Sequence, residues 1–202
     1  MAINLGGNNG VRNNSGNVLD LKKNDILDLT KSNPGLTNIT LGAGWDVAVT
    51  GESFDLDLSA FLLNQNGKIT GGEDVIYFKN RSASGISLSE DNRTGAGDGD
   101  DENIVIDLNK INSSVHKIVF IVNIYDATTR RQTFGMINNS YVRLLNMSNN
   151  EELCRFNLKE DGSTATAMIF CELYREGSEW KFKAIGEGKV VSDLNGIAAL
   201  YM

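Results

Sequence analysis

The sequence predicts a mostly β fold: a β-sandwich of two packed, mainly antiparallel sheets with one or two short helices, including one at the C-terminus. Short segments rich in Val, Ile, Phe and Tyr recur roughly every 8–15 residues, and Asn, Gly and Asp turns separate them. Little helical periodicity lies between these segments. With 202 residues, of which 41% are hydrophobic, the chain can bury a sizeable core.

The chain divides into an Asn/Gly-rich N-terminal extension, residues 1–17, and a single domain, residues 18–202. Residues 4–17 contain six Asn and four Gly, a composition typical of turns. Two short helices are expected, over residues 107–114 and over residues 192–202, where Ser192 or Asp193 would be the N-cap. Strands are expected within residues 18–22, 26–30, 37–42, 44–50, 53–64, 74–79, 102–108, 116–127, 141–147, 152–158, 166–176 and 179–188.

Charge and composition exclude several classes of protein. The net charge of −7 argues against a nucleic-acid-binding protein, which needs a basic face. No apolar run approaches the ~18 residues of a membrane span, and the N-terminus lacks the features of a secretory signal, so a cytoplasmic location is expected. Cys154 and Cys171 alternate with apolar residues and are expected to be buried free thiols.

The single histidine limits the available catalytic chemistry. With His116 alone, a two-histidine zinc site is impossible, and no G-x-S-x-G nucleophile motif accompanies it. We expect His116 to lie on the surface at the start of a strand.

Acidic residues are concentrated in one segment. Residues 90–102 read EDNRTGAGDGDDE, with six acids and one base, so 13 residues carry five of the seven excess negative charges. Interleaved glycines would let several carboxylates converge, and carboxylate and carbonyl oxygens are the ligands that calcium, magnesium and manganese prefer. The segment does not match an EF-hand, and an acidic loop that binds nothing is the alternative.

A second acidic pair alternates with apolar residues. In residues 53–59, SFDLDLS, Phe54, Leu56 and Leu58 fall on one face of a strand, and Asp55 and Asp57 fall on the other. The two aspartates could be further metal ligands or part of a solvated polar face, and the alternation leaves both interpretations open.

Motifs along the chain resemble the TerD family of tellurium-resistance and bacterial stress proteins. The similarity covers roughly residues 25–195. It is carried by GWD (44–46), FDLDLSAFLL (54–63), NGKIT (66–70), GDGDDENI (97–104), IVFIVNIYDA (118–127), RRQTFGMINNSYVRLLN (130–146) and TAMIFCELYREGSEWKFKAIGEG (166–188).

The resemblance implies a cytoplasmic, non-enzymatic β-sandwich that binds calcium, as two ions, and is peripheral at the inner face of the membrane. It implies a role in resistance to tellurite and other stresses, through a protein partner in a membrane-associated complex. The implied metal ligands are Asp46, Asp55, Asp57, Asp91, Asn92, Asp98, Gly99, Asp100, Asp101 and Glu102.

The function predicted on this basis is calcium binding that switches on an interaction. One rival is a metal-assisted phosphoesterase, or a cyclic-nucleotide-binding protein, that uses the same acidic cluster. Another is calcium-bridged binding to anionic membranes, which such proteins usually supplement with basic or apolar residues near the loops.

Overall fold

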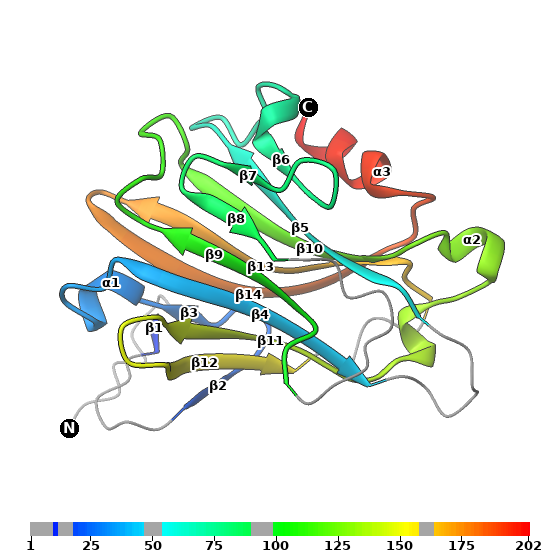
Figure 1. The fold of residues 1–202 in the computed structure, drawn as a ribbon, viewed down its shortest axis with the longest axis horizontal. Coiled ribbons are helices and arrows are strands. Elements are labelled where there is room, and N and C mark those ends of the chain that lie inside the picture. The colour runs from blue at the N-terminus through cyan, green and yellow to red at the C-terminus, as the bar shows by residue number, and fades with distance from the viewer. Residues whose placement is uncertain (1–9, 12–17, 47–53, 90–98, 158–163) are drawn as a thin grey trace.

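In the computed structural model, residues 10–11, 18–46, 54–89, 99–157 and 164–202 are described, and they form two seven-stranded sheets (Figure 1). In strand order, sheet A consists of β1 (Gly10–Val11), β3 (Ile26–Leu27), β14 (Glu179–Lys189), β13 (Ala167–Glu176), β10 (Lys117–Ile124), β5 (Leu56–Leu63) and β6 (Val75–Ile76). Sheet B consists of β2 (Leu19–Leu21), β12 (Glu151–Asn157), β11 (Asn138–Asn146), β4 (Asn38–Asp46), β9 (Glu102–Asp107), β8 (Ile86–Leu88) and β7 (Ser82–Ala83). Described pairs are antiparallel except β1 with β3 and β2 with β12, which confirms the predicted fold class.

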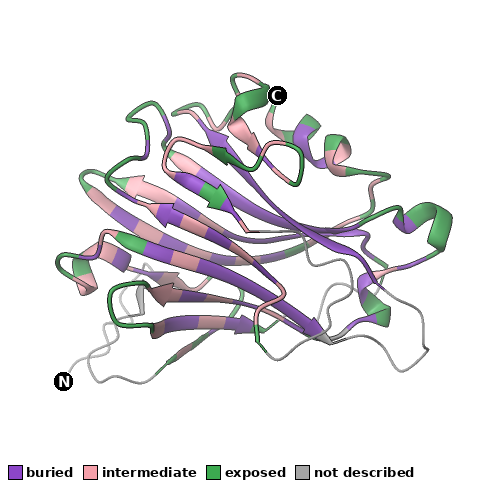
Figure 2. Cartoon of the chain, in the orientation of Figure 1, coloured by how far each residue is buried: buried purple, intermediate pink, exposed green. Residues whose placement is uncertain are grey.

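The core lies between the two sheets and is built from alternate residues of each strand. Figure 2 shows the resulting purple bands of buried residues along both sheets. Cys154 of β12 and Cys171 of β13 belong to this core and are free thiols, as predicted. His116 is exposed and directly precedes β10, which confirms its expected position.

The outer face of sheet A is partly covered by the C-terminus. Helix α3 (Leu194–Ala198) places Ile197 against Phe61 of β5 and its neighbours, in a second apolar cluster. The predicted N-cap is confirmed, because the Asp193 carboxylate accepts a hydrogen bond from the Gly196 N–H at 3.1 Å. A 3-10 turn, η3 (Ala199–Tyr201), follows.

The predicted helix over residues 107–114 is wrong. Strand β9 continues to Asp107, and turns follow it. The Asp107 carboxylate accepts from the Asn109 N–H at 3.1 Å, and the Asn112 side chain accepts from the Ser114 N–H at 3.0 Å. These local bonds offer the backbone an alternative to helical bonding, which is why Asp and Asn favour turns.

Other boundaries also differ from the predictions. The segment 26–30 ends as a strand at Leu27 and continues into α1 (Leu29–Ser32), and the two segments expected over 37–50 are joined in β4 up to Asp46. The remaining short elements are α2 (Ala127–Arg130), η1 (Gly72–Asp74) and η2 (Phe134–Met136). In the N-terminal extension, β1 pairs with β3; residues 1–9 and 12–17 lie outside the described residues.

Candidate functional site

The described residues of the predicted site lie where β4 ends and where β5 and β9 begin. Ala43, near the end of β4, pairs with Glu102 at the start of β9. The Leu58 N–H near the start of β5 donates to Glu102 Oε2 at 2.6 Å, which joins sheet A to sheet B. Asp91, Asn92 and Asp98 lie outside the described residues, as does the side chain of Asp46, whose backbone ends β4.

Asp55 and Asp57 are buried, which decides against a solvated polar face. Both are 7% exposed, and Ser59, the next residue on that face, is fully buried. Phe54, Leu56 and Leu58 point into the core as predicted. The aspartates therefore lie on the outer face of sheet A, on the same face as the cluster under α3.

Asn123 of β10 is a site residue that the sequence interpretation missed. It is the cross-strand partner of Asp57 and is 8% exposed. Its Nδ2 donates to Asp57 Oδ2 at 3.4 Å. Among the residues that the structure describes, none donates a hydrogen bond to its Oδ1 or to the Ser59 hydroxyl. This face thus holds buried oxygen atoms and a carboxylate side by side.

The last residues of the acidic segment, 99–102, lead into β9 and are called the arm here. The arm is held against sheet B. The Asp101 N–H donates to the Ala43 carbonyl at 2.8 Å, and the Asp101 carboxylate accepts from the Trp45 N–H at 3.0 Å. Glu102 is 2% exposed where it accepts from Leu58. Both carboxylates therefore bond to the backbone of neighbouring strands.

Asp100 forms an ion pair with β11. Arg143 Nε donates to Asp100 Oδ1 at 2.8 Å, and the Tyr141 hydroxyl lies 3.1 Å from the same oxygen and 3.0 Å from the Gly99 carbonyl. Burial, followed by the Asp100 charge, raises the pKa of Tyr141. Asp100, which the sequence predicts to be a metal ligand, is thus bonded to an arginine and a tyrosine.

Two glycines of β4 make room for this contact. A Cβ at Gly42 would lie 2.0 Å from Asp100 Oδ2, and a Cβ at Gly44 would lie 2.5 Å from the Tyr141 hydroxyl. A glycine inside a strand marks such a close approach. The GAG segment at residues 42–44 was therefore a sequence signal that something packs on β4.

The ion pair extends into a network on β11 and β12. Glu152 bonds to Arg143 at 3.0 Å and to Arg155 at 2.8 and 3.1 Å, and the Arg155 guanidinium lies 4.2 Å from the centre of the Tyr141 ring. Burial alone would raise the pKa of Glu152, but the hydrogen bonds from Arg155 and Arg143 outweigh it and lower the pKa. The network fixes Arg143 in place for Asp100.

Several buried side chains on the outer face of sheet A carry oxygen atoms, which are the donors that a hard cation prefers. Among the described residues, no three His, Cys, Asp or Glu side chains form a group that could hold a metal ion. Beside Asp57, however, the buried amide oxygen of Asn123 has no described donor, and the polar side chains of that face offer oxygen atoms. Carboxylate and amide oxygens fit Ca²⁺ or Mg²⁺ and not a soft metal.

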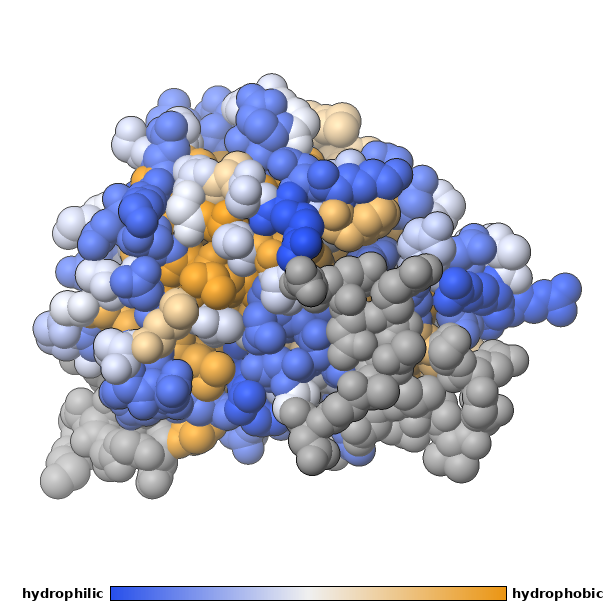
Figure 3. Space-filling model, in the orientation of Figure 1, coloured by the Kyte–Doolittle hydropathy of each residue, from blue (hydrophilic) through white to orange (hydrophobic). Residues whose placement is uncertain are grey.

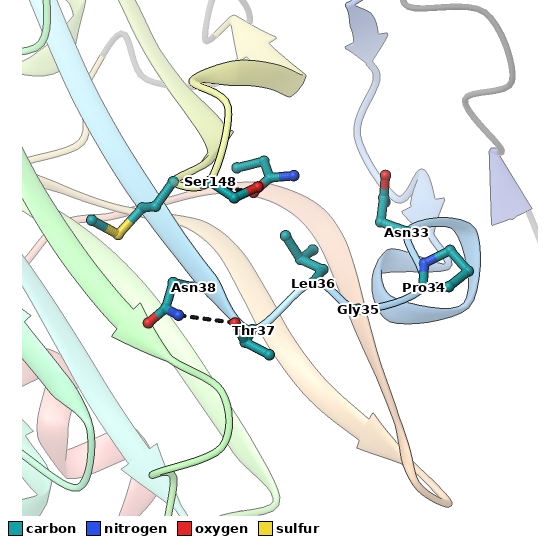
Figure 4. A pocket seen from close by; sticks show the side chains of 9 residues that line it. Asn33, Pro34, Gly35, Leu36, Thr37, Asn38 and Ser148 are labelled. Atoms are coloured by element: carbon teal, nitrogen blue, oxygen red, sulfur yellow. Dashed lines mark hydrogen bonds between the residues drawn. The ribbon is translucent and has the colours of Figure 1, made fainter.

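A separate hollow lies where β4 begins. Its volume is about 320 Å³, and residues 33–38 and 146–148 line it (Figure 4). Asn38 Nδ2 donates to the Thr37 hydroxyl there at 2.9 Å. The lining contains no acidic or basic side chain, so it offers neither a general base nor a cationic anchor for a phosphate.

A TerD domain family model matches residues 18–201. The chain belongs to the TerD family. It is 48% identical over 173 residues to tellurium resistance protein TerD of Serratia marcescens, a match that covers 84% of this chain and 90% of that protein. It is also 41% identical over 199 residues to stress response protein SCP2 of Bacillus subtilis (strain 168), with 92% of this chain and 100% of that protein covered.

TerD-like folds also appear among solved structures. A homologue of telluride resistance protein (TerD) from Streptomyces coelicolor A3(2) superposes with a TM-score of 0.67 at 23% identity, covering 80% of this chain and 95% of that one. At that identity the likeness establishes the fold. The names of the curated relatives describe resistance and stress proteins and no enzyme. Within the described ranges, no helix has the length and apolarity to cross a bilayer.

Proposed function

We propose that this TerD-family protein is a non-enzymatic calcium-binding protein of the tellurium-resistance and stress response. The observation that carries the proposal is the buried pair of Asp57 and Asn123. Burying an amide oxygen without a donor is costly, and the Asn123 amide oxygen lies buried beside a carboxylate. A bound Ca²⁺ would supply the partner that this oxygen lacks.

The predicted ligands beyond the described residues complete this proposal. Calcium takes six to eight oxygen ligands, more than the described face supplies. Asp46, Asp91, Asn92 and Asp98 remain predicted ligands, as do the residues of the arm, and Asp55 lies just before β5, buried like Asp57. The number of ions, predicted as two, depends on these residues.

The interaction that calcium would switch on is expected near this face. The Tyr125 N–H donates to the Asp55 carbonyl at 2.8 Å. The connection that follows β10 therefore begins next to the residues that lead into β5. Tyr125 is 45% exposed there, Met136 is 39% exposed, and Arg130 and Arg131 are exposed. The protruding α2 region is hydrophilic in Figure 3. These residues could contact a partner in a membrane-associated complex at the inner face of the membrane.

Thermal unfolding tests calcium binding. A ligand that binds the folded state alone raises the melting temperature by mass action, so calcium in excess over its dissociation constant should raise it by several degrees relative to a chelator. NaCl at the same ionic strength is the control for nonspecific salt effects. Identical curves in calcium and chelator would overturn the proposal.

Turnover assays test the enzymatic rival. Phosphomonoesters, diesters and cyclic nucleotides would be offered with Ca²⁺, Mg²⁺ or Mn²⁺. We expect no turnover, because Arg143, the described arginine bonded to the arm, is already bonded to Asp100 and Glu152. Sustained hydrolysis that depends on the metal would favour the phosphoesterase.

A further inference from the structure

Asn123 differs from the other buried polar side chains because it lies directly beside the Asp57 carboxylate. The two residues are directly opposite each other on β10 and β5, and both are more than nine-tenths buried. The amide nitrogen is directed to Asp57 Oδ2, at 3.4 Å, which is long for a hydrogen bond to a carboxylate. The amide oxygen has no donor among the described residues.

The amide oxygen of Asn123 is therefore a buried hydrogen-bond acceptor that has no donor among the described residues. An acceptor that is buried and unbonded costs stability, and such an atom in a native protein needs an explanation such as an ion. An apolar residue of similar size would avoid the cost, and the neighbours of Asn123 along the outer face, Val119 and Ile121, are apolar. The amide is therefore present where packing alone would not require it.

We propose that Asn123 is a metal ligand in this protein, contributing its amide oxygen to the calcium ion that Asp57 binds. The inference rests on the proposed function and adds a ligand from sheet A that is outside both acidic segments. A neutral ligand beside Asp57 adds one oxygen to the coordination shell of the calcium ion without adding negative charge. Ligand charge is one of the features that set calcium affinity.

Calorimetric titration of the full chain with Ca²⁺ tests the proposal through two substitutions of nearly equal size. Asn123→Leu removes the oxygen and should weaken calcium binding about tenfold or more. Asn123→Asp retains an oxygen and adds a charge, so it should tighten binding several-fold. In chelator, Asn123→Asp should have the lower melting temperature of the two, because a second carboxylate would then face Asp57 across the strand pair.

A purely structural role gives a different result. It would change the melting temperature of both variants in chelator and leave both calcium affinities within about twofold of the parent. Gln132→Leu, which removes another buried amide in the connection after β10, is the matched control and should leave affinity unchanged.

The outcomes separate this inference from the proposed function. If the parent protein binds no calcium, the proposed function fails and the inference fails with it. If the parent binds calcium and both Asn123 variants bind it equally well, the inference alone is overturned. Opposite shifts in affinity for the two variants would support it.

Discussion

Two acidic regions lie close together in this molecule and differ in what their side chains bond to. In the arm, Asp100, Asp101 and Glu102 bond to Arg143, Trp45 and Leu58. Asp57 of β5 and Asp55, just before that strand, are buried on a sheet face where Asn123 makes a long contact with Asp57. The acidic residues of the arm thus bond to other groups of the protein, whereas the face that carries Asp57 holds a buried amide oxygen with no described donor.

Glu102 should give the largest change in stability. In chelator, Glu102→Ala would leave the buried Leu58 N–H without its acceptor and should reduce the free energy of unfolding by about 3 kcal/mol. Glu102→Gln, the control, keeps an acceptor oxygen and should cost less than half of that. Denaturant unfolding measures both. Equal stability of the alanine variant and the parent would show that Glu102 does not join the two sheets.

Gly42 tests whether the arm is attached at Asp100. Gly42→Ala would place a methyl group within 2.0 Å of Asp100 Oδ2 and so displace this carboxylate from Arg143. We expect a loss of about 2 kcal/mol in unfolding free energy, with calcium affinity within about twofold of the parent. Gly72→Ala is the control, since a Cβ there meets nothing within 4 Å. A large loss of calcium affinity from Gly42→Ala would place a ligand on the arm.

Glu152 should give a smaller, pH-dependent effect. Its pKa is lowered in the folded state, so the stabilisation is present above its ordinary pKa and is lost as the pH falls through the folded pKa. Glu152→Gln should therefore lower stability by about 1 kcal/mol at pH 7, and the difference should disappear in acid. A difference that is constant from pH 7 to pH 3 would argue against the ion pairs with Arg143 and Arg155.

The sequence predicted the fold well because local patterns determine it. Alternation placed Phe54, Leu56 and Leu58 in the core and identified most strands. The helix predicted over 107–114 was wrong because the side chains of Asp107 and Asn112 accept backbone hydrogen bonds that form turns.

The candidate site was harder to predict because it depends on pairings distant in sequence. Asn123 lies within an apolar run and meets Asp57, 66 residues away, through the register of β5 and β10. Asp100 was predicted to be a ligand from the acidic segment alone, and its ion pair with Arg143, 43 residues away, could not be predicted from the sequence. Gly42 and Gly44 were the local signal of that contact.

Calcium titration of Asp57→Asn and Asp100→Asn tests the comparison most directly. Both substitutions remove one charge and keep the side-chain shape, and neither removes an apolar core contact. We expect Asp57→Asn to weaken calcium binding at least tenfold, or about 1.4 kcal/mol, and Asp100→Asn to lower stability in chelator while affinity stays within about twofold. If Asp100→Asn abolishes calcium binding and Asp57→Asn leaves it intact, the arm binds the metal and the account is contradicted.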